Sequence, residues 1–446
     1  MAEDIQGLIE SVIEATEAEA EDGSLQVLLA SRDSEEIALL LESLSVEQRV
    51  DIWRSLPVDM RLNVLVVMRA DPRERILDDL STDEMDSLLT GLDAEDLLEL
   101  ADSLSNRLIE YALRRMDEQQ REWFIGAQQY EESLAGHWVD HELLILPQNA
   151  KVRDALRLLR RETPEYSDAV FLINRTGQFI DIVKVGRVWQ QPDHIPLADL
   201  REEDCAVIDA NEDAVSASLK VQKSKLAALP VIDAQLKLIG RLEKGAACEL
   251  VNEYYERQLM AGAGMDEDED LFAPVSKSVQ GRTIWLGINL LTAFAASWFI
   301  GLFEATLQQV VALAILMPVV ASMGGISGSQ TLTLIIRGLA LNQITDSNRR
   351  ALLMKELYVG LSSGLIWALI IGLVVSAWFD SWMIGLVIAL AILLNIVAAA
   401  VSGVVIPTIL KRLKIDPALS GSVILTTVTD IIGFVAFLGI GTLVLI

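Results

Sequence analysis

Hydrophobic residues after residue 283 are gathered into long runs that predict membrane-spanning helices. The last run, Ala418–Ile446, is almost continuously apolar, and at about 1.5 Å per residue it is long enough to cross a hydrocarbon core of roughly 30 Å. The runs are Ile284–Phe303, Leu307–Met323 with a continuation Thr331–Leu341, Leu357–Phe379, Met383–Leu410 and Ala418–Ile446. The pattern therefore predicts an α-helical transmembrane domain of five helices over residues 284–446.

The second run is interrupted by Met323-Gly324-Gly325-Ile326-Ser327-Gly328-Ser329-Gln330. Such a polar, glycine-rich segment inside an apolar run predicts a broken helix whose free carbonyls face protein or a wet cavity. On this interpretation Gly324, Gly325, Gly328 and Gln330 line a polar path. Alternatively, Gly324 and Gly328 form a close-packing face, because they are four residues apart. The two interpretations are compatible.

Residues 1–135 read as an acidic, all-α helical-repeat domain. Leucine followed by a helix-start residue recurs on one 12-residue grid, which misses only the step at Met68-Arg69. The pairs are Leu44-Ser45, Leu56-Pro57, Leu80-Ser81, Leu92-Asp93 and Leu104-Ser105. Ser45 with Gln48 and Ser81 with Glu84 have the spacing of a capping box. Helices this short are marginal alone, so we expect them to stack.

Residues 136–258 alternate between strand and helix patterns in two similar β-α-β-β-α units. Each unit is too small to close its own core, so we expect the two to pack as a pair. The strand segment Leu226–Asp233 resembles the signature strand of CBS (cystathionine-β-synthase-type) domains. That resemblance implies an α/β tandem CBS pair with a regulatory role, whose clefts in relatives bind adenine nucleotides or ions.

Residues 259–283 are expected to form a connecting, plug-like helix between the soluble and membrane parts. They contain a Gly/Ala turn and the acid run Asp266–Asp270, which we interpret as a solvated linker. The whole chain is thus predicted to be a multidomain membrane protein.

The formal net charge is −28, and only seven Lys/Arg and six Asp/Glu lie after residue 283, so the acidity belongs to the soluble part. This charge argues against nucleic acid and anionic headgroups as its partners and is compatible with cations. Cys205 and Cys248 have no metal-ligand spacing. The three histidines lie outside the spans, no nucleophile–base pair is visible, and no phosphate-binding loop is present, so neither an enzyme nor an ATP-driven pump is expected.

Basic residues lie before the first span and in every second loop, as the positive-inside rule requires for a cytoplasmic N-terminus and an external C-terminus. The acidic start of the chain lacks the basic-then-apolar pattern of a secretory signal, which agrees with this topology. We expect a multi-pass membrane protein, in contact with membrane lipid.

Asp430 is the strongest candidate for a functional residue. A carboxylate inside a spanning helix costs on the order of 2.5–3.5 kcal/mol on insertion scales, so it usually faces a polar path or a partner. Ser422, Thr426, Asp430 and Gly433 share one helical stripe, which suggests a cation pathway. The alternative is a structural acid that bonds to a neighbouring helix.

Several segments together resemble the membrane domain of MgtE-type magnesium channels. They are Pro318 with the glycine segment, Leu334–Arg337, Asp416-Pro417-Ala418-Leu419 and Thr429–Gly433, and Tyr130–Gly136 is similar to the junction that follows the helical domain in that family. The resemblance implies a homodimer whose pore lies at the dimer interface. It also implies that Asp430 holds a hydrated Mg²⁺, that Asp416 lies at the cytoplasmic mouth, and that intracellular Mg²⁺ closes the pore.

The chain departs from the family pattern at several positions. Ile326, Ser329 and Ser422 stand where the family commonly has asparagine, which bears on Mg²⁺ selectivity. Lys244 and Ala247 replace acids that are expected at the cation-sensing interface. The remaining candidates for a regulatory cation site are Glu243, Glu253, Glu256 and Asp86.

These observations predict a metal-binding, passive channel or transporter for divalent cations, most simply one for Mg²⁺ uptake with cytoplasmic regulation. Its pore residues are expected to be Asp430, Asp416, Thr426 and Ser422. The alternative is an exchanger that couples a divalent cation to Na⁺ or H⁺.

Overall fold

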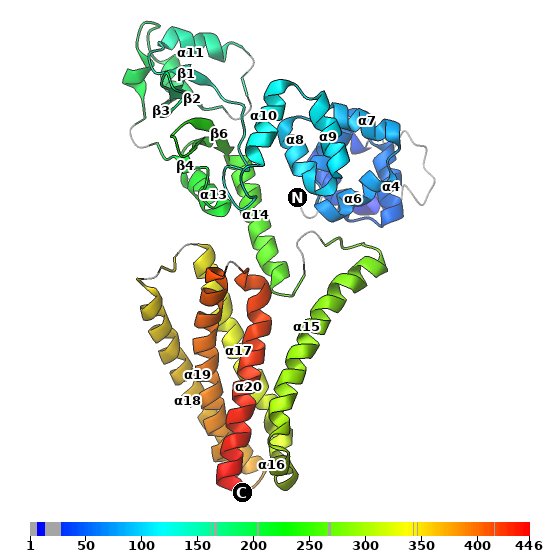
Figure 1. Cartoon of the computed structure of the whole chain (residues 1–446), viewed down its shortest axis with the longest axis vertical. Helices are drawn as coiled ribbons and strands as arrows, with labels where there is room; N and C mark the ends of the chain where they lie inside the picture. Colours follow the sequence, from blue (N-terminus) through cyan, green and yellow to red (C-terminus); the bar gives the residue numbers. More distant parts are fainter. Residues whose placement is uncertain are drawn as a thin grey trace. The chain divides into compact units, whose positions relative to one another are not determined.

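The computed structural model describes residues 7–13, 28–161, 163–164, 167–202, 205–265, 269–341, 343–345, 347–413 and 415–446 (Figure 1). The described residues form two compact units. One comprises residues of Met1–Glu256 and Glu267–Lys277, and the other comprises residues of Arg257–Asp266 and Ser278–Ile446. We describe each unit by itself.

The first unit begins with a stack of short helices. They are α3 (Ser34–Glu42), α4 (Val46–Ser55), α5 (Val58–Val67), α6 (Ala70–Asp79), α7 (Thr82–Thr90), α8 (Ala94–Leu100), the 3₁₀ turn η1 (Ala101–Ser103), α9 (Asn106–Arg115) and α10 (Glu118–Ala127). Residues 7–13 are also helical. The N-cap residues of α3 to α10 recur every 12 residues, from Asp33 to Asp117. The predicted repeat is confirmed. Arg69, where the leucine-and-cap pattern is missing, is nevertheless the N-cap of α6, so the 12-residue spacing continues through it.

Only one of the two predicted capping boxes forms. The Ser81 side chain accepts from the backbone of Glu84, and the Glu84 carboxylate accepts from the backbone of Ser81. At Ser45 the prediction is wrong, because the hydroxyl donates to the Gln48 side chain at 2.8 Å and makes no bond to the helix backbone. The leucines of the repeat, including Leu44 and Leu56, are buried or partly buried in one continuous core.

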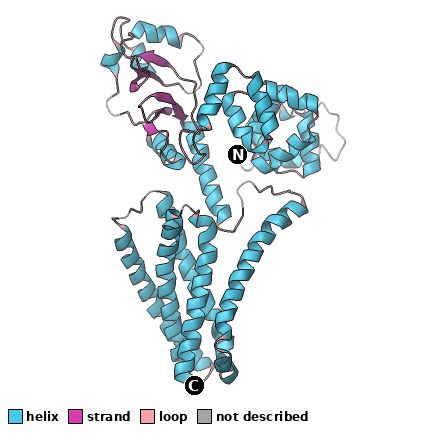
Figure 2. Cartoon of the chain, in the orientation of Figure 1, coloured by secondary structure: helices cyan, strands magenta, loops and turns pink. Residues whose placement is uncertain are grey.

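The α/β part of this unit contains two three-stranded sheets, and Figure 2 shows where these strands lie. Its elements are β1 (Ile145–Pro147), α11 (Val152–Leu159), β2 (Ala169–Ile173), β3 (Phe179–Lys184), α12 (Val185–Trp189), the 3₁₀ turn η2 (Leu197–Leu200), β4 (Ile208–Asp209), α13 (Ala214–Lys223), β5 (Ala228–Ile232), β6 (Leu238–Glu243) and α14 (Lys244–Ala261). In each sheet the first strand pairs parallel to the second, and the second pairs antiparallel to the third.

The two α/β units share a hydrophobic core, as the sequence predicts. Phe171 and Ile182 of the first unit pack in the same cluster as Leu229, Val231 and Leu242 of the second. The backbone N–H of Ala227 also donates to the Asp168 carboxylate across the pair, at 3.0 Å. This arrangement agrees with the tandem pair that the CBS resemblance implies.

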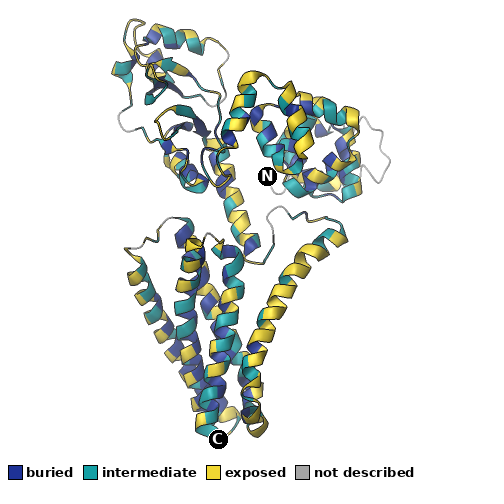
Figure 3. Ribbon diagram, viewed as in Figure 1, coloured by how far each residue is buried: buried dark blue, intermediate teal, exposed yellow. Residues whose placement is uncertain are grey.

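The second unit contains five helices that are long and apolar enough to cross a membrane. They are α15 (Val275–Gly301), α17 (Val311–Ala340), α18 (Arg349–Trp378), α19 (Trp382–Arg412) and α20 (Pro417–Leu445), with the short helix α16 (Glu304–Gln309) between the first two. Leu313, Val320, Val387, Ile388 and Phe437 are buried where α17, α19 and α20 pack together. Most side chains of α15 are exposed, as Figure 3 shows. The predicted multidomain membrane fold is confirmed.

The predicted break in the second span is wrong. The glycine-rich segment lies inside the single 30-residue helix α17, which keeps its helical hydrogen bonding through Gly324, Gly325 and Gly328. The reason is tertiary packing: a methyl group added at Gly324 would overlap with Asn395, and one added at Gly328 would lie 3.0 Å from the Leu425 side chain. Glycine's cost in helix propensity is about 1 kcal/mol per residue, which such packing can offset.

The acid run before the membrane part is not simply a solvated linker. Asp266, Glu267 and Asp268 lie outside the described residues. Asp270 is buried, and its two carboxylate oxygens accept from the Arg49 guanidinium at 2.7 and 2.9 Å. Seven residues later, Lys277 contacts Asp71 at 2.9 Å and Glu74 at 3.2 Å. The helical-repeat domain therefore holds this segment by two sets of ion pairs.

Candidate functional site

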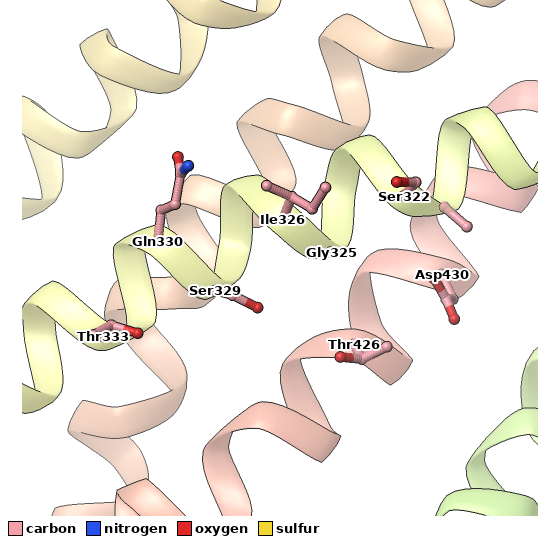
Figure 4. Close-up of a pocket in the computed structure, with 9 residues that line it drawn as sticks. Ser322, Gly325, Ile326, Ser329, Gln330, Thr333, Thr426 and Asp430 are labelled. Carbon is pink, nitrogen blue, oxygen red and sulfur yellow. The ribbon is translucent and has the colours of Figure 1, made fainter. Parts of the chain in front are cut away.

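An open groove of about 790 Å³ runs between α17 and α20 in the membrane part (Figure 4). Its lining residues from α17 recur at intervals of about one helical turn. They are Ala321, Ser322, Gly325, Ile326, Ser329, Gln330 and Thr333. Thr426 and Asp430, which are one turn apart on α20, complete the lining. The groove is thus a mostly small and oxygen-bearing surface on helices that are otherwise apolar.

Asp430 is the one ionisable side chain among the described residues that line the groove. It is half-buried, and Thr426 next to it is exposed. In Figure 4 the oxygens of Ser329 and Thr426 face the space between the two helices, whereas Gln330 projects from another side of α17. The groove can therefore offer a carboxylate and neutral oxygens to a cation or to its water shell.

The threonine hydroxyls of α20 have a fixed orientation. Thr426 Oγ1 donates to the carbonyl of Ser422 at 2.9 Å, and Thr427 Oγ1 donates to the carbonyl of Val423 at 2.7 Å. Because the proton of each hydroxyl is used within the helix, its oxygen lone pairs remain available as acceptors. Thr426 is therefore prepared to face a cation or the hydrogens of a hydrated cation.

The other two predicted pore residues of α20 do not line this groove. Ser422 lies one turn before Thr426 and is partly buried. Asp416 is the N-cap of α20, where its carboxylate accepts from the backbone of Ala418 at 2.7 Å. Asp416 is exposed, and its 14-residue separation from Asp430 corresponds to roughly 21 Å along the helix.

The glycines of α17 divide into two groups. Gly325 faces the groove, and a methyl group added there would meet no atom within 4 Å. Gly324 and Gly328 are buried, the first against Asn395 and the second against Leu425. The packing interpretation of the glycine segment therefore holds for Gly324 and Gly328, while Gly325 and Gln330 line the groove.

Two buried polar residues of the membrane part were not singled out by the sequence pattern. Glu356 of α18 is buried, is ion-paired with Lys355 and lies 3.4 Å from Thr331 Oγ1. Asn395 of α19 is fully buried. Asn395 is a polar residue inside the predicted run Met383–Leu410, which is the signal that identified Asp430, whereas Glu356 directly precedes the run Leu357–Phe379.

Three of the four predicted regulatory carboxylates are paired with arginines. Glu243 contacts Arg241, Glu256 lies 2.9 Å from Arg69, and Asp86 lies 2.9 Å from Arg115. Within the described ranges, no group of three or more His, Cys, Asp or Glu side chains is arranged to hold a metal ion. Ala247, which stands where the family has an acid, is buried in the core of the CBS pair.

The fourth candidate, Glu253 of α14, lies in an acidic environment next to the helical-repeat domain. The pKa of Glu99 is raised to about 7, mainly by burial. The charge of Arg73 lowers this pKa, and the carboxylates of Glu253 and Glu249 raise it. Burial also raises the pKa of Glu249 itself. The carboxylates of α14 therefore oppose deprotonation of Glu99 on α8.

Two family models match the chain. Residues 317–440 match the model described as MgtE, divalent cation transporter, and residues 32–133 match the MgtE intracellular N domain. The chain is 25% identical over 319 residues to the magnesium transporter MgtE of Bacillus subtilis strain 168, which covers 70% of each chain.

Two solved structures are similar to the soluble part. The CBS pair domain of a putative Mg²⁺ transporter from Shewanella oneidensis MR-1 is 34% identical, covers 38% of this chain and 98% of its own, and has a TM-score of 0.33. The cytosolic domain of the Mg²⁺ channel MgtE in complex with ATP is 17% identical, covers 54% of this chain and 99% of its own, and has a TM-score of 0.48.

Proposed function

Because the chain belongs to the MgtE family of divalent cation transporters, we propose that it conducts Mg²⁺ passively along the groove between α17 and α20. The observation that supports this most directly is Asp430, a carboxylate in an open, oxygen-lined groove on membrane-spanning helices. An ionised side chain is costly in hydrocarbon, so a place in a polar path explains why it is tolerated. Asp430 is the proposed pore carboxylate, and Thr426 is its neutral neighbour.

The proposal includes a homodimer with the groove at its interface. In the single chain, Ser329 and Thr426 are exposed along the groove, and these polar side chains would face lipid if the groove stayed uncovered. Two grooves facing each other would replace lipid with a water-filled path that contains two Asp430 carboxylates. Ser422 and Asp416 are proposed to lie along the same path toward the cytoplasm.

The chemistry of the groove suits a hydrated dication. Mg²⁺ requires six oxygens at 2.0–2.1 Å and gives up water reluctantly, so it usually keeps several waters and binds through one or two carboxylates. Hydroxyl oxygens such as those of Ser329 and Thr426 can accept hydrogen bonds from the retained waters. No covalent step and no bound nucleotide are needed for passage.

We further propose uptake into the cytoplasm across the bacterial inner membrane, with the N-terminus inside and the C-terminus outside. The charges of the loops support this topology. Each charge that crosses 100 mV gains about 2.3 kcal/mol, so an inside-negative potential favours entry of a dication by roughly 4.6 kcal/mol.

The cytoplasmic part is proposed to regulate conduction through the segment that leads to α15. The ion pair of Asp270 with Arg49 attaches this segment to the helical-repeat domain, and the ion pair of Lys277 with Asp71 attaches the first turn of α15 to it. A regulatory Mg²⁺ near Glu253 and an adenine nucleotide at the CBS pair belong to this proposal. So does the division into domains at residues 1–135, 136–258, 259–283 and 284–446.

Uptake of Mg²⁺ into proteoliposomes at an imposed inside-negative potential tests the main proposal. We expect flux that rises with potential in the natural chain and falls about tenfold or more in Asp430→Asn, because loss of even 1.4 kcal/mol of ion binding is a factor of ten. The matched control is Asp380→Asn. Asp380 is an exposed carboxylate after α18 with φ of 48°, a conformation that asparagine tolerates, so flux should stay unchanged.

Two results would contradict the proposal. Equal flux in Asp430→Asn and in the natural chain would remove Asp430 from the path. Flux that requires a Na⁺ or H⁺ gradient would replace passive conduction with exchange along the same groove.

A further inference from the structure

Asn395 lies where three membrane helices meet. It is fully buried near the middle of α19, and its Nδ2 donates to the carbonyl of Val320 on α17 at 2.9 Å. Only the amide nitrogen can donate to a carbonyl, so this bond fixes the orientation of the side-chain amide. Among the described residues, Oδ1 of Asn395 is buried without a hydrogen-bond partner.

The Asn395 amide occupies a notch made by two glycines of the groove helices. A methyl group added at Gly324 of α17 would overlap with the amide. One added at Gly433 of α20 would lie only 2.5 Å from Nδ2. Gly324 precedes the groove residue Gly325, and Gly433 comes three residues after Asp430. The amide therefore touches both walls of the groove from behind.

Stability alone does not explain an asparagine at this position. A buried polar atom without a partner costs about 1–3 kcal/mol, a cost that an apolar side chain of similar shape would not carry. Leucine is close to asparagine in shape, and the neighbours Ile392 and Ile396 are buried apolar residues of the same helix. A directional bond to α17 is the property that leucine would lack.

We propose that Asn395 is a positioning residue for ion conduction: by bonding to α17 within the notch of Gly324 and Gly433, it fixes the spacing of α17 and α20. The width of the groove at Asp430 then depends on this side chain. This inference rests on the proposed function of the groove as the ion path.

The test compares Asn395→Leu in the full-length protein with Asn289→Leu. Asn289 is a matched control, because it lies exposed on α15 and its amide donates to the carbonyl of Trp285 in its own helix. In proteoliposomes we expect Asn395→Leu to lower Mg²⁺ flux about tenfold and to change the ratio of Ca²⁺ to Mg²⁺ flux several-fold. Its thermal midpoint in detergent should stay unchanged or rise. Asn289→Leu should change none of these quantities.

A second measurement does not depend on flux. Spin labels at Leu334 of α17 and Ile424 of α20, both exposed, report the spacing of the two helices in protein diluted with unlabelled chains. Cys205 and Cys248 are first replaced by serine. The distance distribution should shift or broaden in Asn395→Leu and stay the same in Asn289→Leu.

Three results would overturn the inference. Unchanged flux and flux ratio in Asn395→Leu would show that the amide does not act on the path. A parallel fall of flux and thermal midpoint would show a merely structural role. An unchanged distance distribution would show that Asn395 does not set the spacing of α17 and α20. This result can be read even if the natural chain conducts no Mg²⁺ and the proposed function itself fails.

Discussion

The pair Arg49–Asp270 shows how much a single residue can contribute in the soluble part. The Arg49 side chain is fully buried, and besides the two bonds to Asp270 it donates to the carbonyls of Leu41 and Leu44 at 2.9 and 3.2 Å. Four of its five N–H donors are therefore directed at fixed acceptors in a dry environment. A charge in such a place depends on its partner, because removing one member leaves the other buried and unpaired.

Replacing Arg49 by methionine should lower the free energy of unfolding of the helical-repeat domain by about 3–5 kcal/mol, the usual cost of breaking a buried ion pair. Thermal unfolding of the full-length protein, followed by circular dichroism, measures the effect. Arg54→Met is the matched control. Arg54 pairs with Asp79 at the surface, where both side chains are about half exposed, so we expect a change within about 1 kcal/mol. Similar losses in the two variants would contradict the assignment of the Arg49 pair as buried.

At the scale of elements, α17 combines two surfaces in one helix. One surface faces the groove with Ser322, Gly325 and Ser329, and the other packs through Gly324 and Gly328. Two adjacent glycines therefore have different roles. Gly325 leaves space in the groove, and Gly324 allows the close contact of α17 with α19.

This division predicts opposite outcomes for two neighbouring substitutions. Gly324→Ala should destabilise the membrane part by about 1–3 kcal/mol, the usual cost of overpacking a tight contact, because the added methyl group overlaps with Asn395. Gly325→Ala should leave the thermal midpoint in detergent unchanged, because nothing lies within 4 Å of its added methyl group. A larger loss in Gly325→Ala than in Gly324→Ala would reverse the assignment of the two surfaces.

The sequence predicted the elements well where one physical signal dominates. The 12-residue repeat follows from leucines and N-caps, and the five spans follow from hydrophobicity. It failed at the glycine segment, because a run of small residues predicts both a break and a close contact, and only the partner helix decides between them. Asn395 and Asp270 were missed for the same reason: their partners, Val320 and Arg49, are distant in sequence.

At the scale of the whole molecule, the polar groove of a single chain would face lipid unless another surface covered it. Its exposed polar residues on membrane-spanning helices support the proposed dimer, and the sequence could suggest this assembly only through the family resemblance. The positions of Asp430 and Thr426 in one groove were predicted from their helical stripe. The separate locations of Ser422 and Asp416 depend on how α20 packs against α17, which periodicity alone does not specify.

The dimer predicts that Thr426 lies close to its own copy in the partner. In a chain with Cys205 and Cys248 replaced by serine, Thr426→Cys should give a covalent dimer with a short thiol-reactive crosslinker in membranes. Leu373→Cys, an exposed position on α18 outside the groove, is the matched control and should stay monomeric under the same conditions. Crosslinking at Leu373 but not at Thr426 would place the interface on another face.

The Arg49–Asp270 pair also has a consequence for the order in which the chain is made. The two residues are 221 positions apart. A ribosome therefore finishes the helical repeats and the whole CBS pair before it adds Asp270, the partner of Arg49. Domains generally fold as units during synthesis, the N-terminal one first. Here the first domain completes its core last, at about the time when α15 emerges for insertion. Released chains that end before residue 270 should therefore be more sensitive to proteases in α4 than released chains that end a few residues beyond it.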